Sequence, residues 1–183
     1  MHRSLLLLVL LLAGCATAPV EVQRPAQLDA PFAFNGRVAF RHGDQRESAG
    51  VRWVHHATED EILLLAPLGQ TVARIHRDMQ EASLDTTDKH YTSQSMEDLM
   101  QQVLGWQLPL AGLRYWVTAL PAPEGDFKVE RDANGQLKTL SQQGWEISYS
   151  RYAADTADAL PLRMKLQRDD MQVLLLIDEW EAQ

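Results

Sequence analysis

The sequence is poor in cysteine, in basic residues and in long apolar runs. Its 183 residues include one cysteine, which excludes a disulfide within the chain and a zinc site built from four thiolates. Lys and Arg total 17 against 25 Asp and Glu, which gives a net charge of −8. This balance argues against nucleic-acid binding and against adhesion to anionic lipid through overall charge. Apolar residues make up 45%, so we expect a folded chain, and the length fits one domain.

Familiar catalytic and metal-binding patterns are also missing. The sequence has neither a Gly-x-Ser-x-Gly elbow nor a glycine-rich phosphate loop. His55 and His56 are adjacent, so on a strand they point to opposite faces and cannot bind one metal ion together. The acidic run of residues 59–61 is typical of a solvated turn before a strand. We therefore expect a protein that is not an enzyme and that binds no metal or cofactor.

The first fifteen residues have the pattern of a secretory signal. Arg3 precedes eight apolar residues, 5–12, whereas a membrane-spanning helix needs about 20. Leu12-Ala13-Gly14-Cys15 resembles the bacterial lipobox, whose cysteine receives a diacylglyceryl group and becomes an acylated N-terminus. Residue 16 is alanine, not the aspartate of an inner-membrane retention signal. The resemblance implies a signal peptide over 1–14, lipidation at Cys15 and an outer-membrane anchor on the periplasmic face. A plain signal peptide or a buried strand with an incidental cysteine is the alternative.

The pattern after the cysteine changes at Gly36. Three prolines interrupt residues 16–31, which favours a tether over a long helix. Beyond Gly36, apolar and polar residues alternate, most clearly over 145–149 and 162–167. Such alternation predicts strands with one apolar and one solvated face, and the short spacings favour antiparallel hairpins.

Two segments follow a helical pattern instead. Residues 95–104 place Met96, Met100 and three further apolar residues on one helix face, with Ser95 as N-cap and Gly105 as a stop. A shorter helix is expected from Leu110 to Leu120, ended by a proline. The helices cover only part of a long curled sheet. The remaining apolar surface either encloses a cavity for a lipid or small molecule, or is filled by the protein's own side chains.

Residues 67–69 break the expected polarity of a turn. Pro67 cannot continue a strand ladder and Gly69 favours a turn, which places Leu68 at the end of a hairpin. Leu68 either folds back on the sheet or is an exposed apolar tip for a membrane or an acyl chain. Burying a leucine contributes about 1.5–3 kcal/mol, enough to bias an encounter but too little to anchor a protein.

Nine short motifs follow one another along the chain: Cys15, Gly36–Phe40, Trp53, Pro67–Gln70, Leu104–Gly105, Leu108–Leu110, Leu113–Val117, Gly144–Tyr149 and Trp180. In order and spacing, these motifs together resemble the LolB family, the outer-membrane receptors of the lipoprotein-localisation pathway. The resemblance implies a mainly β fold, an unclosed antiparallel barrel of eleven strands with a small helical lid over an apolar cavity. The family usually has a longer helix before the first strand, and the prolines of residues 16–31 depart from that.

The resemblance and the alternation together set the expected boundaries. The signal peptide is 1–14, the lipidated N-terminus and tether 15–35, and the open barrel domain 36–183. The expected strands are 36–42, 46–54, 60–66, 70–76, 79–85, 89–92, 126–130, 136–141, 144–150, 161–168 and 171–180.

The resemblance also implies a function. A LolB-like protein accepts triacylated lipoproteins from the periplasmic carrier LolA and inserts them into the outer membrane, as a monomer and without catalysis. Residues 67–69 match the membrane-insertion loop, with Leu68 as its leucine. The residues expected to line the lipid cavity are Val38, Phe40, Val51, Trp53, Ile62, Leu64, Ile75, Leu84, Met96, Met100, Trp145, Ile147, Tyr149, Met164, Leu166, Val173 and Leu175. A structural or scaffold lipoprotein is the first alternative, and a lipid hydrolase on the same anchor is the second.

Overall fold

A computed structural model describes residue 24 and residues 27–104 and 109–182. The described residues between Phe32 and Glu181 form eleven strands and two helices. The strands are β1 (Phe32–His42), β2 (Gln45–His56), β3 (Glu59–Leu65), β4 (Thr71–Arg77), β5 (Ala82–Thr86), β6 (His90–Ser93), β7 (Phe127–Arg131), β8 (Leu137–Gln142), β9 (Trp145–Tyr152), β10 (Pro161–Arg168) and β11 (Met171–Glu181). The helices are α2 (Met96–Leu104) and α3 (Leu110–Trp116). The predicted mainly β class is confirmed.

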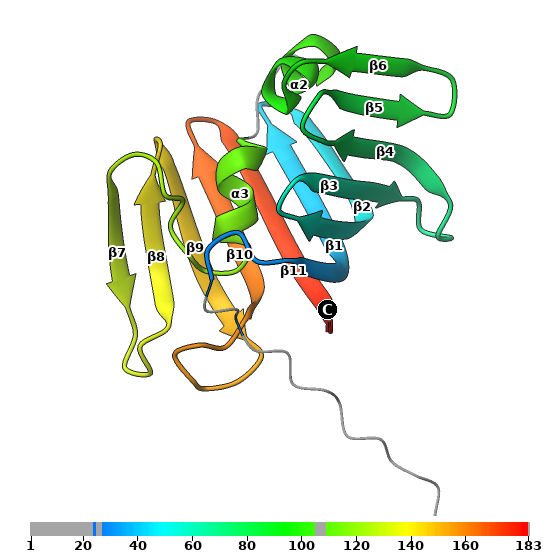
Figure 1. Ribbon diagram of the computed structural model, residues 1–183. Helices are drawn as coiled ribbons and strands as arrows, with labels where there is room; N and C mark the ends of the chain where they lie inside the picture. The colour runs from blue at the N-terminus through cyan, green and yellow to red at the C-terminus, as the bar shows by residue number, and fades with distance from the viewer. Residues whose placement is uncertain (1–23, 25–26, 105–108, 183) are drawn as a thin grey trace, which may run out of the picture.

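All eleven strands form one antiparallel sheet that does not close. Their order is β6-β5-β4-β3-β2-β1-β11-β10-β9-β8-β7, so β6 and β7 are the two free edges. The first and the last strand are neighbours at the centre, paired from Ala33 opposite Glu181 to His42 opposite Met171. Figure 1 shows the curved sheet with α3 in front of its β9–β11 part and α2 beside β6. The expected unclosed barrel with a helical lid is thereby confirmed.

Strand β1 begins four residues earlier than the predicted residue 36. Phe32 and Phe34 are buried and pack edge-on against Trp53 and Trp180, with ring centroids 5.2 Å and 5.3 Å apart. This aromatic cluster holds the strand end in the sheet, so residues 32–35 belong to β1 and not to the tether in which the sequence had placed them. Strand β1 therefore provides core residues from its first position.

Strand β5 begins later than predicted, at Ala82 instead of residue 79. The Asp78 carboxylate accepts hydrogen bonds from the backbone N–H groups of Gln80 (2.7 Å) and Glu81 (3.0 Å). A side chain that caps its own following backbone in this way makes a turn, and these residues are then not available to a strand.

The ends of the helices follow local hydrogen bonding. The hydroxyl of Ser95 accepts a bond from the N–H of Asp98 at 3.1 Å, so the predicted N-cap of α2 is confirmed. Gly105, the predicted stop, lies outside the described residues. Helix α3 ends at Trp116, before the predicted Leu120, because Ala119 takes a left-handed conformation (φ +56°) and the N–H of Leu120 turns back to the carbonyl of Tyr115.

The two described helices have 9 and 7 residues. Within the described part of the chain, no helix has the length and apolar composition needed to cross a membrane.

Candidate functional site

The concave side of the sheet carries one continuous apolar cluster. The cluster contains all seventeen residues expected to line a cavity, and thirteen of them are buried. Register explains their common orientation, since direct partners in an antiparallel sheet share a face. Trp53 pairs with Ile62, which pairs with Ile75, and Leu64 faces inward opposite Val51.

Helix α3 closes the cluster over β8 and β9 through three buried polar side chains. The Tyr149 hydroxyl donates to the carbonyl of Trp116 at 2.8 Å, and the Trp116 indole donates to the Gln142 side-chain oxygen at 2.9 Å. Gln142 also pairs with the backbone of Ala122, accepting from its N–H and donating to its carbonyl, each at 2.8 Å. The sequence alone does not identify Gln142. Only its place at an inward-facing position of β8 distinguishes it from an exposed glutamine.

The cluster is less covered over β1, β3 and β4. Val38, Phe40, Leu64 and Ile75 lie on the same concave face but are only half-buried. Helix α2 packs on β5 and β6 and α3 packs toward β8 and β9, so these four side chains lie between the two helices. In this part of the concave face the apolar side chains are therefore partly accessible to solvent.

The loop after β3 presents a leucine to solvent. Ala66 and Gln70 are joined by a backbone hydrogen bond of 2.9 Å, and the N–H of Gly69 donates to the carbonyl of Ala66 at 2.8 Å. Gly69 has φ +84°, a conformation that glycine adopts readily. Leu68 is 86% exposed, so it does not fold back on the sheet. Figure 1 shows this loop reaching out beyond the sheet at the right of the view.

A buried polar network lies at the ends of β2 and β3 away from the Leu68 loop. Asp60 is 7% exposed and accepts hydrogen bonds from the Trp53 indole (2.9 Å) and the Arg77 guanidinium (2.7 Å). His55 Nδ1 lies 2.7 Å from the same carboxylate. The prediction that residues 59–61 form a solvated turn is therefore wrong for Asp60, which is a strand residue on the inner face. His56 is exposed and His55 buried, so the prediction that they point to opposite faces is confirmed.

Burial and hydrogen bonding act against each other on Asp60. Burial by itself raises the pKa of this carboxyl, but hydrogen bonds from His55, Trp53 and Arg77 and the charge on His55 outweigh it, so the pKa lies below its usual value. Asp60 is thus a charged group held in the protein interior. The partners come from β2, β3 and β4, so the network joins these three strands.

The network extends to the residues before β1 and to the lid. Asp29 Oδ1 lies 3.2 Å from His55 Nε2 and 3.2 Å from Arg114 Nε of α3. Asp29 has φ +62° and lies in the segment that precedes β1. One carboxylate therefore links the start of the domain, strand β2 and the lid helix.

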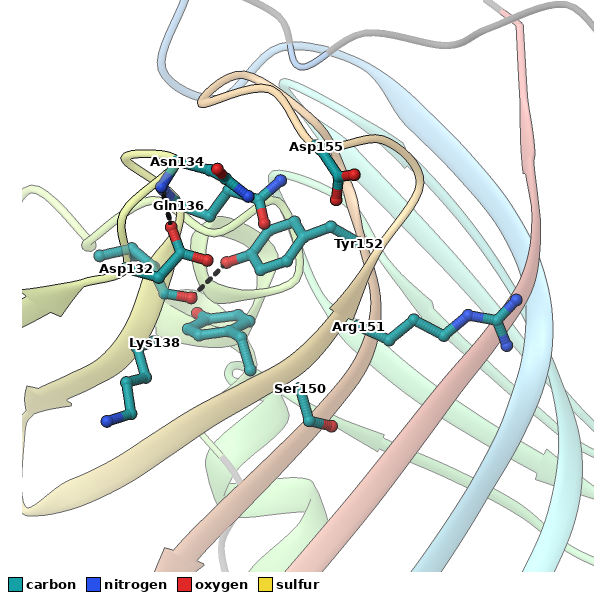
Figure 2. A pocket seen from close by; sticks show the side chains of 10 residues that line it. Asp132, Asn134, Gln136, Lys138, Ser150, Arg151, Tyr152 and Asp155 are labelled. Atoms are coloured by element: carbon teal, nitrogen blue, oxygen red, sulfur yellow. Dashed lines mark hydrogen bonds between the residues drawn. The ribbon is translucent and has the colours of Figure 1, made fainter.

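A pocket of about 330 Å³ lies elsewhere, near the ends of β8 and β9 (Figure 2). Its lining is polar and includes Asp132, Asp155, Lys138 and Arg151. Tyr152 donates to the carbonyl of Leu137 at 2.6 Å, and burial raises its pKa, so it remains a neutral donor. This lining differs from the apolar surface expected to hold acyl chains.

Whether the described part of the chain could bind a metal ion depends on how its His, Cys, Asp and Glu side chains are arranged. There, no cluster of three or more His, Cys, Asp or Glu side chains has a metal-binding arrangement. Cys15, the expected lipidation site, lies outside the described residues. The features brought together are therefore a concave apolar face, a lid helix and a projecting leucine.

Comparison with known proteins identifies relatives over nearly the whole chain. The family model "Outer membrane lipoprotein LolB" matches residues 30–180. The outer-membrane lipoprotein LolB of Nitrosomonas europaea is 37% identical over 191 residues, covering 96% of this chain and 90% of that protein. The LolB of Chromobacterium violaceum is 37% identical and covers 98% of this chain and 99% of that protein. The LolB of Pseudomonas aeruginosa is 33% identical, with coverage of 93% and 91%.

The fold is shared with a solved structure of a LolA superfamily protein from Nitrosomonas europaea. The TM-score is 0.52 at 8% sequence identity, covering 87% of this chain and 88% of that one. This likeness concerns the fold alone, whereas the sequence relatives and the matched family model concern the family. The chain belongs to the LolB family of outer-membrane lipoproteins.

Proposed function

We propose that this protein accepts triacylated lipoproteins from the periplasmic carrier LolA and inserts them into the outer membrane. Family membership and the LolA-superfamily fold support a role in lipoprotein localisation at the outer membrane. The observation that carries the finer proposal is the exposure of Leu68 at the end of a loop beside a concave apolar face. The protein acts as a monomer and forms no covalent intermediate with its cargo.

The transfer is driven by differences in apolar burial. Each acyl methylene exposed to water costs about 0.8 kcal/mol, so acyl chains leave a carrier only for another apolar surface. The half-buried side chains Val38, Phe40, Leu64 and Ile75 provide the entry surface. The buried cavity residues of β9, Trp145, Ile147 and Tyr149, are reached when α3 moves, because α3 covers the concave face over β8 and β9.

Leu68 acts at the final step. Fully burying one leucine contributes about 1.5–3 kcal/mol, which favours contact of the loop with lipid without fixing the protein there. Pro67 and Gly69 keep the leucine at the end of a short turn. Residence at the membrane comes instead from lipidation at Cys15, since two or more acyl chains give stable anchoring. In this scheme residues 1–14 are the signal peptide, and the tether that starts at Cys15 ends before the acceptor domain, which begins with β1 at Phe32 and not at the expected residue 36.

A reconstituted transfer assay tests the proposal. An acylated lipoprotein bound to LolA is mixed with this protein, first in solution and then with vesicles, and the location of the cargo is measured. We expect cargo to move to the parent protein, and Leu68→Glu to accept it but fail to deliver it to vesicles. Met79→Glu is the matched control, because Met79 is 80% exposed in another turn. If cargo stays on LolA when the parent is added, the acceptor role is wrong.

A scaffold role without lipid transfer is the second candidate. The observation that favours it is the burial of thirteen of the seventeen expected cavity residues, as in an interior filled by its own side chains. An apolar fluorescent probe separates the two. Uptake that acylated cargo displaces supports the acceptor, and absence of uptake at any concentration supports the scaffold.

A further inference from the structure

The convex face of the sheet carries two pairs of arginines that face each other. Arg41 of β1 is the direct register partner of Arg46 of β2, and Arg163 of β10 is the partner of Arg151 of β9. All four are exposed. Like charges directly opposite each other destabilise a sheet, so each pair has an energetic cost in the isolated protein.

The two pairs share one face. Arg37 lies on the same side of β1 as Arg41, four residues away, and Arg37 is level with Leu176, which pairs in turn with Arg163. The concave apolar residues Val38 and Phe40 alternate with these positions on β1. The arginine pairs therefore lie on the side of the sheet opposite to α2 and α3.

Neighbouring arginines on this face are neutralised, but these four are not. Arg37 pairs with Asp178 at 2.8 Å, Arg52 pairs with Glu181 at 2.9 Å, and Arg74 pairs with Glu61. Within the described residues, no carboxylate lies within 4.0 Å of the guanidinium groups of Arg41, Arg46, Arg151 or Arg163. Although the chain has 25 acidic residues, none of those in the described part forms an ion pair with either opposed arginine pair.

The surface between the pairs is suited to lipid headgroups. Exposed Lys165 is the partner of half-buried Leu174, which also pairs with Ala39 of β1. Basic side chains thus surround a shallow apolar strip. Long basic side chains of this kind hold their charge at headgroup level while their stems cover apolar surface.

The Arg41–Arg46 pair also lies at the same end of the sheet as Leu68. The last pairing of β3 with β2 is Leu65 with Gly50, and β2 continues five residues further, to Gln45. The loop that carries Leu68 follows Leu65 directly, so it leaves the sheet beside the segment that contains Arg46. A surface in contact with these arginines is therefore within reach of the exposed leucine.

We propose that Arg41, Arg46, Arg151, Arg163 and Lys165 form a binding surface for the phosphate groups of anionic membrane lipids. Contact through this convex face orients the protein with Leu68 at the lipid surface and the concave face directed toward the periplasm, where cargo arrives. The orientation rests on the proposed function, but the binding surface does not. Phosphates between the opposed arginines remove their repulsion, which offsets the energetic cost of the two pairs.

Vesicle binding tests this surface directly. The chain from residue 15 onward, which contains every described strand and helix, carries Cys15→Ala so that no lipid anchor is attached. Binding is measured to vesicles of phosphatidylethanolamine with one-fifth phosphatidylglycerol, and to vesicles of phosphatidylcholine, at low and high salt. We expect tighter binding to the anionic vesicles and loss of that preference at high salt.

Paired substitutions identify the residues. Neutralising one basic side chain near an anionic surface weakens binding about fivefold, so Arg41→Gln with Arg46→Gln is expected to weaken it at least tenfold. The matched control is Arg131→Gln with Lys138→Gln, which removes the same charge near the other end of the sheet. At low salt the Arg41–Arg46 variant also unfolds at a higher urea concentration than the parent, because a repulsive pair is gone.

The outcomes separate this proposal from the others. Equal binding of the parent to both vesicle types, or equal loss in both double variants, overturns it. Salt-sensitive binding of the parent to an acidic protein without any preference for anionic vesicles overturns it in favour of a protein partner. Cargo transfer from LolA in solution, without vesicles, is measured in parallel, so failure of the acceptor role is seen independently of vesicle binding.

Discussion

Two groups of strands, β8–β10 and β1–β4, show the same alternation of apolar and polar residues, but their inward-facing apolar side chains are buried to different extents. We call β8–β10 the closed side and β1–β4 the open side. On β8, β9 and β10, Leu140, Ile147, Met164 and Leu166 are fully buried at 0% exposure. On β1, β3 and β4, Val38, Phe40, Leu64 and Ile75 also point inward but stay half-buried, although Phe34 and Ile62 on the same strands are buried. Alternation determines which face a side chain joins, whereas the position of a short helix determines whether that face is covered.

The interactions that hold the two sides also differ. The closed side, β8–β10, is tied to α3 by neutral hydrogen bonds from Tyr149 and Gln142. On the open side, β1–β4, the charged Asp60 network joins β2, β3 and β4 at the strand ends away from the Leu68 loop. We therefore expect the stability of the closed side to come mainly from packing, and the stability of the open side to vary with pH as well.

The largest expected effect is a cavity mutation on the closed side. Met164→Ala should lower the free energy of unfolding by about 2–5 kcal/mol, since it removes a fully buried side chain. Ile75→Ala on the open side should cost distinctly less, because part of its surface is already exposed. Urea denaturation of both variants measures the difference, and equal losses would contradict the division into two sides.

The next effect concerns acid sensitivity. A carboxyl whose pKa is lowered by folding stabilises the protein above its unfolded pKa, and this contribution is lost as the pH falls through the folded value. Asp60→Asn should therefore cost about 3 kcal/mol at neutral pH and give a flatter loss of stability below about pH 4. Urea midpoints between pH 3 and 7 provide the test. Asp88→Asn, in an exposed turn, serves as the control and should follow the parent.

A smaller effect is expected for the tie between α3 and the sheet. Gln142→Ala leaves the Trp116 indole and the Ala122 N–H without a buried acceptor, at a cost of about 2 kcal/mol. Amide hydrogen exchange should increase in α3 more than in α2. A uniform increase across both helices would mean that Gln142 supports the whole fold and not the lid.

The smallest effect on stability is expected at the exposed loop. Leu68→Ser should change the free energy of unfolding by less than about 0.5 kcal/mol, because the side chain contacts little of the protein. The same substitution should reduce delivery of cargo to vesicles. A loss of more than about 1 kcal/mol in urea denaturation would show that Leu68 packs on the sheet in solution.

Much of the fold could be predicted because the strands alternate and because the motifs resemble a known family. The class, the eleven strands and the Ser95 cap follow from such local signals. The end of α3 could not, because it depends on a left-handed alanine that no local rule requires. Asp60 looked solvated, because the burial of an acidic residue depends on partners from other strands that sequence spacing does not reveal.

The arginine pairs escaped prediction for a related reason. A net charge of −8 describes the whole chain and says nothing of how charge is distributed between two faces of a sheet. Arg41 and Arg46 are five positions apart in sequence, but only the register makes them direct partners. Strand pairing, and not composition, therefore determines which charges repel each other.

The pairing of β1 with β11 has a consequence for how the chain acquires its structure. The middle of the sheet pairs β1, from Ala33, with β11, up to Glu181, so the first described strand pairs with the last described strand as well as with β2. Hairpins on both sides of this seam are local in sequence, whereas the seam itself is a long-range pairing that forms slowly. Removal of residues 174–183 takes away most of β11 and should therefore leave β1–β6 and β7–β10 as two separate groups of strands without the seam that joins them.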